Sequence, residues 1–150
     1  MLQEERKIMS KYYAILDTNV LVSAMLKANS TPSAVVAEAL KGDIIPVLNE
    51  KIIAEYEDVL NRPKFKFNHD TVKLLLLELK RRCVYSNEGI VDDFVQDHND
   101  VVFYAVLMDT RKEKDAYLVT GNLKHFPVKP YVVTPREMLD IVMAERLDNA

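Results

Sequence analysis

A carboxylate stands at the end of the first apolar strand predicted for this chain. Residues 12–17 read as a buried strand that ends at Asp17, and an apolar helical pattern begins directly after it. A charged side chain at the carboxyl tip of a buried strand contributes little to packing, whereas ligands of open parallel α/β sheets bind beyond that end of the strands. Asp17 is therefore the first candidate for a residue that performs chemistry.

Three further segments place acids or amides beside other predicted strand ends. Glu55 falls in the second turn of the helix after the second strand. Asp97 and Asp100 flank the start of the helix after the third strand, and Asn122 follows the fourth. Because a helix that follows a strand of a parallel sheet begins at that strand's carboxyl end, we expect these residues at one edge of the sheet. Carboxylates gathered there would suit Mg²⁺ or Mn²⁺, which prefer oxygen ligands.

Three polar residues next to these acids are candidates for a supporting role. Thr18 and Asn19 follow Asp17, and Thr120 precedes Asn122 by two positions. Their side chains could orient metal ligands or a substrate phosphate by hydrogen bonds. A metal ion held there would polarise the scissile phosphate and lower the pKa of a bound water.

The elements that must position these residues follow from apolar periodicity and from capping signals. Strands are expected at residues 12–17, 44–48, 83–86, 116–120 and 131–134, and helices at residues 19–27, 34–41, 50–61, 70–82, 100–111 and from 135 onward. Ser33 and Asn49 are the expected N-caps of the second and third helices, and Gly42 ends the second. Pro46 is awkward inside a strand, since proline is tolerated mainly at strand starts, edges or bulges.

Strands that alternate with helices predict a parallel sheet covered on both faces, a three-layer α/β/α arrangement. Residues 1–11 show little apolar periodicity and are expected to be an N-terminal extension, and residues 12–150 are expected to form a single domain. Met9 could be an alternative start of the chain.

Composition limits the classes of function. The 150 residues carry a net charge of −3, which argues against binding nucleic acid through a basic face alone but not against a nuclease that attracts phosphate through bound metal. A single cysteine, Cys83, excludes an internal disulfide and a multi-cysteine zinc site. The apolar run from Val101 to Met108 is too short to span a bilayer, and the first ten residues lack a signal peptide's apolar stretch. We therefore expect a cytoplasmic protein without membrane attachment.

Four motifs in order resemble the PIN-domain family of metal-dependent ribonucleases, especially the VapC-like branch found as toxins of toxin–antitoxin pairs. They are the run Leu-Asp-Thr-Asn-Val-Leu-Val-Ser-Ala at 16–24, the segment 53–65 around Glu55, the spacing Asp97-x-x-Asp100 before an apolar helix, and Asp-Ala-Tyr-Leu-Val-Thr-Gly-Asn at 115–122. The resemblance covers residues 12–138, nearly the whole chain.

The resemblance implies a five-stranded parallel sheet in the order 3-2-1-4-5, with Asp17 and Asn122 facing each other where the order reverses. It also implies a hydrolase that cleaves RNA, a Mg²⁺ or Mn²⁺ cofactor, a small antitoxin partner and a homodimer. Asp17, Glu55 and Asp100 match the acidic metal site. The family's usual fourth acid falls at Asn122, so a second metal is in doubt, and Asp97 could partly compensate.

Simpler explanations exist for each residue. Asp17, Asp97 and Asp100 could cap helices, and Glu55 could be a solvated acid that complements a helix dipole. Two other functions also stay open. One is a catalytically weakened PIN module that binds RNA or an antitoxin, and the other is an aspartyl phosphatase. The phosphatase would need a second acid where Asn19 stands.

Two other features could contact a nucleic acid. The segment Arg62-Pro-Lys-Phe-Lys-Phe67 interleaves cations and aromatic rings and could bind single-stranded RNA. A helix-ending loop with two core phenylalanines is the simpler interpretation. His125 could contact a phosphate, whereas His69 and His98 fit ordinary surface roles because the three histidines lack metal-ligand spacing.

Overall fold

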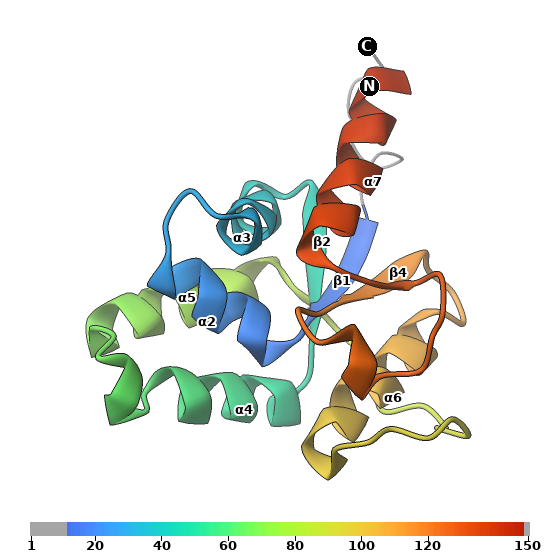
Figure 1. Cartoon of the computed structure of the whole chain (residues 1–150), viewed down its shortest axis with the longest axis horizontal. Coiled ribbons are helices and arrows are strands. Elements are labelled where there is room, and N and C mark those ends of the chain that lie inside the picture. The colour runs from blue at the N-terminus through green and yellow to red at the C-terminus, as the bar shows by residue number, and fades with distance from the viewer. Residues whose placement is uncertain (1–11, 149–150) are drawn as a thin grey trace.

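Five parallel strands form one sheet in the computed structural model, which describes residues 12–148 (Figure 1). The strands are β1 (Tyr12–Leu16), β2 (Ile44–Leu48), β3 (Val84–Tyr85), β4 (Ala116–Val119) and β5 (Val132–Val133). Their order is β3-β2-β1-β4-β5, and each pair of neighbours is parallel. The predicted order is confirmed, and it reverses between β1 and β4.

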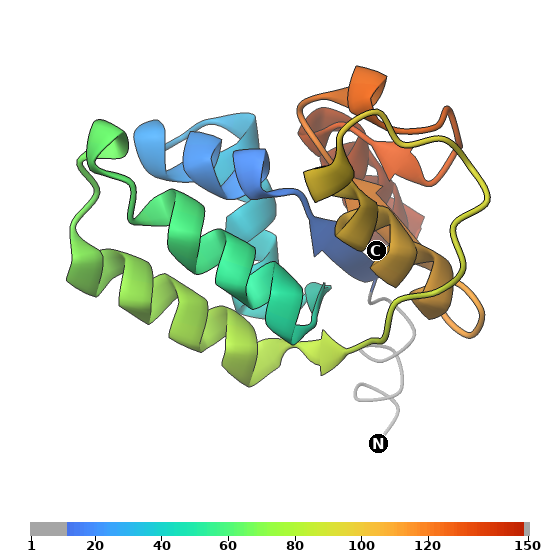
Figure 2. The same cartoon turned by 90° about the horizontal axis from the view of Figure 1, so that it is seen from below.

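Helices cover both faces of this sheet, so the predicted three-layer arrangement is also confirmed. The helices are α2 (Thr18–Leu26), α3 (Thr31–Lys41), α4 (Glu50–Leu60), α5 (His69–Arg82), α6 (Val101–Thr110) and α7 (Pro135–Asp148). Three short 3₁₀ turns are η1 (Pro63–Phe65), η2 (His98–Asp100) and η3 (Leu123–His125). α3 packs against α7 on one face, whereas α6 lies on the opposite face against β1, β2 and β4 (Figures 1 and 2).

The centre of the sheet is the core of the molecule. Ala14, Ile15 and Leu118 are completely buried, because both faces of β1 and β4 lie under helices. α6 is apolar on several sides. Its residues Phe103 and Leu107 are buried as well. The polar residues that follow β1 and β4 therefore emerge from a rigid apolar support.

Two local signals explain how β2 and α3 form. Pro46 pairs in register with Ala14, and β3 begins only opposite Val47. In a parallel strand, successive N–H groups point to alternate neighbouring strands. The position of the N–H group that Pro46 lacks faces the β3 side, where β3 has not yet begun, so no hydrogen bond between strands is lost. The N-cap predicted at Ser33 is wrong. Ser30 caps α3, because its hydroxyl accepts a hydrogen bond from the Ser33 N–H at 3.2 Å.

The other capping predictions are confirmed. Asn49 Oδ1 accepts from the Ile52 N–H at 2.9 Å at the start of α4. Gly42 ends α3 in the left-handed region with φ 97°, which glycine adopts at little cost. Across residues 12–148, no helix is long and apolar enough to cross a membrane. The expected N-terminal extension (residues 1–11) and the possible start at Met9 lie outside the described residues.

Candidate active site

The backbone at the end of β1 is held on both sides by hydrogen bonds, one from another strand and one from a side chain. The Asp17 N–H donates to the Val119 carbonyl of β4 at 2.9 Å. On the other side, the buried Tyr56 hydroxyl donates to the Leu16 carbonyl at 2.5 Å. Asp17 thus leaves the sheet at a point fixed by both β4 and α4.

Buried hydrogen bonds orient the Asp17 side chain. Asp17 is 5% exposed, and its Oδ2 accepts hydrogen bonds from the Thr120 hydroxyl at 2.7 Å and from Asn19 Nδ2 at 3.0 Å. Asp17 occupies the N-cap position of α2, but its side chain makes no capping hydrogen bond. Capping therefore does not explain this carboxylate, whose hydrogen bonds run to Thr120 and Asn19.

Burial also changes the electrostatics of Asp17. Desolvation raises the pKa of its carboxyl group, while hydrogen bonds from the Thr120 hydroxyl and the Thr18 amide act in the opposite direction. The nearby charge of Glu55 raises this pKa further. A buried carboxylate of this kind gains from a cation beside it.

Asn19 and Thr120 connect the tips of β1 and β4. Besides contacting Asp17, Asn19 accepts a hydrogen bond from the Gly121 N–H at 3.1 Å, and the Thr120 Oγ1 accepts one from the Asn122 N–H at 3.0 Å. Asn122 is exposed, and no hydrogen bond of its side chain occurs within residues 12–148. Its amide thus stands free at the point where the strand order reverses.

Glu55 approaches the same edge from α4. Its side chain is half-buried, and its Oε2 accepts from the Thr18 hydroxyl at 3.3 Å. Because Thr18 directly follows Asp17 in the chain, this contact brings Glu55 close to Asp17, and its charge raises the pKa of Asp17. Thr18 therefore links α2 to the acid of α4.

Asp100 brings a third carboxylate at the start of α6. Its side chain is 15% exposed, and Oδ2 lies 3.3 Å from Nδ1 of His125 without hydrogen-bond geometry. Among the described residues, this buried oxygen has no hydrogen-bond partner. Burial, followed by the charges of Asp17 and Asp97, raises the pKa of Asp100 to about 6, and His125 acts in the opposite direction.

Asp97 behaves differently from Asp100. It is exposed, and its Oδ1 accepts from the Asn99 N–H at 2.9 Å, so it caps the short turn η2. Asp100 occupies the N-cap position of α6 but makes no capping hydrogen bond. The capping interpretation thus describes Asp97 and does not describe Asp100.

Asp17, Glu55 and Asp100 form what we call the acidic rim. In the part of the chain that the structure describes, no three His, Cys, Asp or Glu side chains form a group that could hold a metal ion. Mg²⁺, however, usually keeps several waters and binds through one or two carboxylates plus substrate phosphates. Asp17 and Asp100 fit this mode, because the unpartnered buried oxygen of Asp100 lies within the influence of the Asp17 charge.

A sequence model of the PIN domain matches residues 13–124, most of the chain. The chain belongs to the PIN-domain family. PIN domains are in general nucleases that act on nucleic acids, and they typically use divalent metals. The resemblance of the sequence motifs is thereby confirmed at the level of the family. Searches among curated proteins and among solved structures found no match.

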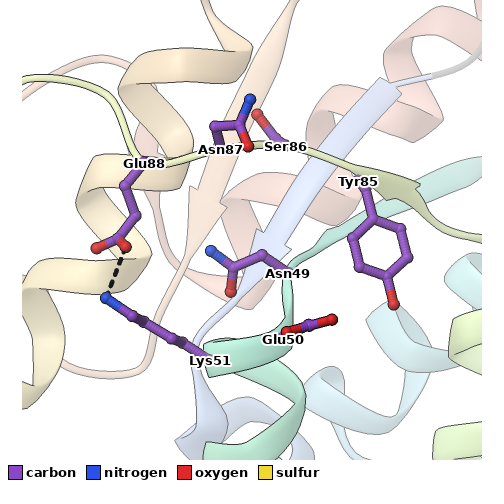
Figure 3. Close-up of a pocket in the computed structure, with 7 residues that line it drawn as sticks. All are labelled: Asn49, Glu50, Lys51, Tyr85, Ser86, Asn87 and Glu88. Carbon is purple, nitrogen blue, oxygen red and sulfur yellow. Dashed lines mark hydrogen bonds and ion pairs between the residues drawn. The ribbon is translucent and has the colours of Figure 1, made fainter.

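This PIN domain also carries a pocket of about 500 Å³ at the carboxyl ends of β2 and β3 (Figure 3). Lys51 Nζ and Glu88 Oε2 form an ion pair at 2.8 Å on its wall. Its lining residues are Asn49, Glu50, Lys51, Tyr85, Ser86, Asn87 and Glu88. The acids of the rim do not line it, so the pocket and the rim are separate features.

Two residues of the PIN domain's site were poorly marked in the sequence. Tyr56 fits the apolar face of its helix, and no sequence signal indicated that its hydroxyl would hold the end of β1. His125 was expected to contact a phosphate, and in the structure it lies against Asp100. Its position three residues after Asn122 was the available signal.

Proposed function

We propose that this PIN domain is a metal-dependent endoribonuclease that hydrolyses RNA phosphodiester bonds. The observation that supports it is a buried oxygen of Asp100 that lacks a hydrogen-bond partner among the described residues and lies within the influence of the buried Asp17 charge. Two desolvated carboxylates, one of which raises the pKa of the other, destabilise a fold unless a cation or a proton accompanies them. A divalent cation delivered with an RNA phosphate is the partner that suits the family.

The three carboxylates of the acidic rim would have different roles in binding the metal ion and its water. Asp17 and Asp100 would hold Mg²⁺ or Mn²⁺, with Glu55 as a further ligand or as an acceptor for a bound water. When bound, the ion would polarise the scissile phosphate and lower the pKa of a water.

Polar neighbours would hold these ligands in place. Thr120 and Asn19 fix the Asp17 carboxylate through hydrogen bonds, and Thr18 does the same for Glu55. Such outer hydrogen bonds keep a ligand oriented before substrate arrives. Asp97 and Asn122 would contribute through water rather than directly, since Asp97 already caps η2 and Asn122 is neutral.

The finer biological role proposed is that of a VapC-like toxin, a cytoplasmic homodimer neutralised by a small antitoxin. This rests on the resemblance of the four sequence motifs. The alternative is a weakened module that binds RNA or an antitoxin without cleaving. The neutral, exposed amide of Asn122 favours that alternative, because it removes one charge from the rim.

Cleavage of a labelled RNA by the wild type and by Asp17→Asn tests the nuclease function. The amide keeps acceptor oxygen for Thr120 but removes the charge. Changes to residues that only orient a metal ligand cost about 10–100-fold, so we expect a loss of more than ~100-fold, with circular dichroism unchanged. Asp140→Asn is the matched control, because Asp140 is an exposed acid of α7 whose side chain is 67% accessible. Undiminished, EDTA-resistant cleavage by Asp17→Asn would refute the metal mechanism.

A further inference from the structure

Two aromatic rings stack on the surface beyond α4. The rings of Phe65 and Phe67 lie almost parallel, with centroids 5.4 Å apart and an interplanar angle of 11°. Both are partly exposed. Phe67 rests against the hydrophobic core, and Phe65 does not. The expectation of two core phenylalanines is therefore wrong for Phe65, and its position calls for another explanation.

A tight turn holds these rings together. The Lys66 N–H donates to the Pro63 carbonyl at 3.1 Å, and Lys66 adopts the left-handed conformation with φ 56°. Residues other than glycine adopt this conformation uncommonly, and such positions often occur at functional sites. The geometry keeps two apolar rings at the surface of a short, constrained segment.

The same segment concentrates positive charge on a chain whose net charge is −3. Arg62 pairs with Asp58 at 2.9 Å, whereas Lys64 Nζ lies 5.0 Å from the centroid of the Phe65 ring. Within residues 12–148, neither Lys64 nor Lys66 forms an ion pair with an acid. Two unpaired ammonium groups beside an aromatic ring match the phosphates and bases of a single strand.

α4 connects this segment to the acidic rim. Glu55 and Arg62 are seven positions apart. Glu55 lies inside α4, which ends at Leu60, and Arg62 follows the helix end with an extended backbone. At 1.5 Å per residue, Glu55 and Leu60, the last residue of α4, are separated by about 7.5 Å along the axis, which corresponds to about two stacked nucleotides at ~3.4 Å each. Figure 2 shows α4 leading from the sheet toward η1 and the start of α5.

We propose that residues 62–67, the aromatic turn, bind single-stranded RNA a few nucleotides from the scissile phosphate. A base stacks on the Phe65 ring in place of the Lys64 side chain, and Lys64 and Lys66 then contact backbone phosphates. The inference rests on the proposed function, because the acidic rim binds the other end of the same strand. Stacking tolerates any base, so this surface selects single-stranded RNA rather than a particular sequence.

Binding measurements on the catalytically inactive Asp17→Asn chain test the aromatic turn. Fluorescence anisotropy with a labelled single-stranded RNA, in EDTA, reports affinity without cleavage. Adding Phe65→Leu keeps apolar volume but removes the aromatic face. Its affinity should fall by between about fivefold and 150-fold, the measured range for one stacked base. Phe65→Tyr keeps the ring and should bind like the parent. If Phe65 has only a structural role, the apolar Phe65→Leu variant should keep the parent's RNA affinity better than Phe65→Tyr does.

Salt dependence separates phosphate binding from stacking. Changing Lys64 and Lys66 to Gln should reduce the slope of log K against log salt by about 0.7 for each phosphate that a lysine neutralises in the parent. Lys112→Gln, at the end of α6, is the control and should leave the slope unchanged. A matched RNA duplex should bind Phe65→Leu and its parent equally, because its bases are already stacked on one another.

The results distinguish this inference from the nuclease proposal. RNA binding by the aromatic turn is refuted if Phe65→Leu and its parent bind single-stranded RNA equally. It is also refuted if changing Lys64 and Lys66 to Gln leaves the salt slope unchanged. Both conclusions hold even if the wild type cleaves RNA. Binding through the turn by a wild type that never cleaves supports the inference and overturns the nuclease proposal. A wild type that binds no RNA overturns both.

Discussion

Asp17 is the residue at which the proposed chemistry and the packing of the fold make opposite demands. It is a carboxylate in a nearly water-free position, and its side chain accepts hydrogen bonds from Thr120 and Asn19 instead of capping the helix that it precedes. These donors compensate part of the desolvation. Among the described residues, no lysine or arginine forms an ion pair with Asp17, which is the condition expected of a metal ligand before metal arrives.

Asn122 permits a gain-of-affinity prediction at the residue scale. A neutral amide offers one oxygen but no charge, so we expect at most one metal ion, bound weakly without RNA phosphate. Asn122→Asp should tighten Mn²⁺ binding by about 10–100-fold, the range for changes near a metal. Isothermal titration calorimetry of both forms measures this.

A matched amide elsewhere supplies the control. Asn87→Asp adds the same charge in the pocket at the end of β3, away from the acidic rim, and should leave the Mn²⁺ affinity unchanged. Equal Mn²⁺ affinities of the wild type and Asn122→Asp would mean that position 122 does not face the metal.

At the scale of elements, the loop between β3 and α6 leads to Asp97 and Asp100. It is anchored near its start. The Gly89 N–H donates to the Ala105 carbonyl of α6 at 2.7 Å, and an added Cβ would lie 2.9 Å from the Asp109 nitrogen. The loop therefore lies directly against the backbone of α6.

Replacing Gly89 by alanine should disturb this packing. The added methyl group meets backbone atoms that cannot rotate away, and overpacking of this kind costs typically ~1–3 kcal/mol. We expect a lower free energy of unfolding in urea by that amount. Ile90→Ala is the control, because the neighbouring Ile90 side chain is 81% exposed and its truncation should change stability little. An unchanged urea midpoint for Gly89→Ala would show that the loop can lift from α6.

Asp109 holds the start of the same loop through hydrogen bonds whose contribution to stability depends on pH. Its Oδ2 accepts hydrogen bonds from the Ser86 hydroxyl at 2.7 Å and the Asn87 N–H at 3.1 Å. The Ser86 hydrogen bond is the main cause that lowers the pKa of Asp109, and Lys112 lowers it further. A carboxyl group whose pKa is lower in the folded state than in the unfolded state stabilises the fold at pH values above its ordinary pKa near 4. This stabilisation is lost as the pH falls through the pKa of the folded state.

In Asp109→Asn, the free energy of unfolding should therefore decrease less at acidic pH than in the wild type. The amide oxygen can still accept from Ser86, but it does not titrate. Urea unfolding between pH 5 and pH 2 should show a smaller loss of stability in Asp109→Asn than in the wild type. Asp140→Asn, on α7, serves as the control. Parallel curves for Asp109→Asn and the wild type would refute this role of Asp109.

At the scale of the whole molecule, the sheet topology gathers residues that are distant in sequence. The order reverses between β1 and β4, so the tips of these two strands lie side by side. Thr120 reaches Asp17 across 103 positions of the chain. A ligand site at such a switch point is the general rule for open α/β sheets.

The proposed toxin role predicts a phenotype and an assembly. Expression of the chain alone should arrest growth, and Asp17→Asn at equal expression should not. Light scattering should give about twice the chain mass of 17.2 kDa if the protein is a homodimer. Normal growth with abundant soluble wild-type protein would contradict the toxin role, and a mass equal to one chain would contradict the dimer.

The sequence by itself determined the elements, their order along the chain and the types of residue at the strand ends. These signals are local: apolar periodicity marked the strands, Asn49 marked the start of α4 and Gly42 the end of α3. The predicted start of α3 was wrong because two serines in this segment, Ser30 and Ser33, are both suitable N-caps. Ser30 is the N-cap in the structure.

Only the tertiary structure decided which of these residues touch. Capping was an available explanation for Asp17, Asp97 and Asp100, and only Asp97 caps with its side chain. The contact of His125 with Asp100 rather than with a phosphate, and the partial exposure of Phe65, likewise appeared only in the structure. The physical reason is that burial and hydrogen-bond geometry depend on which strands become neighbours, and long-range pairing sets distances that local residue patterns do not encode.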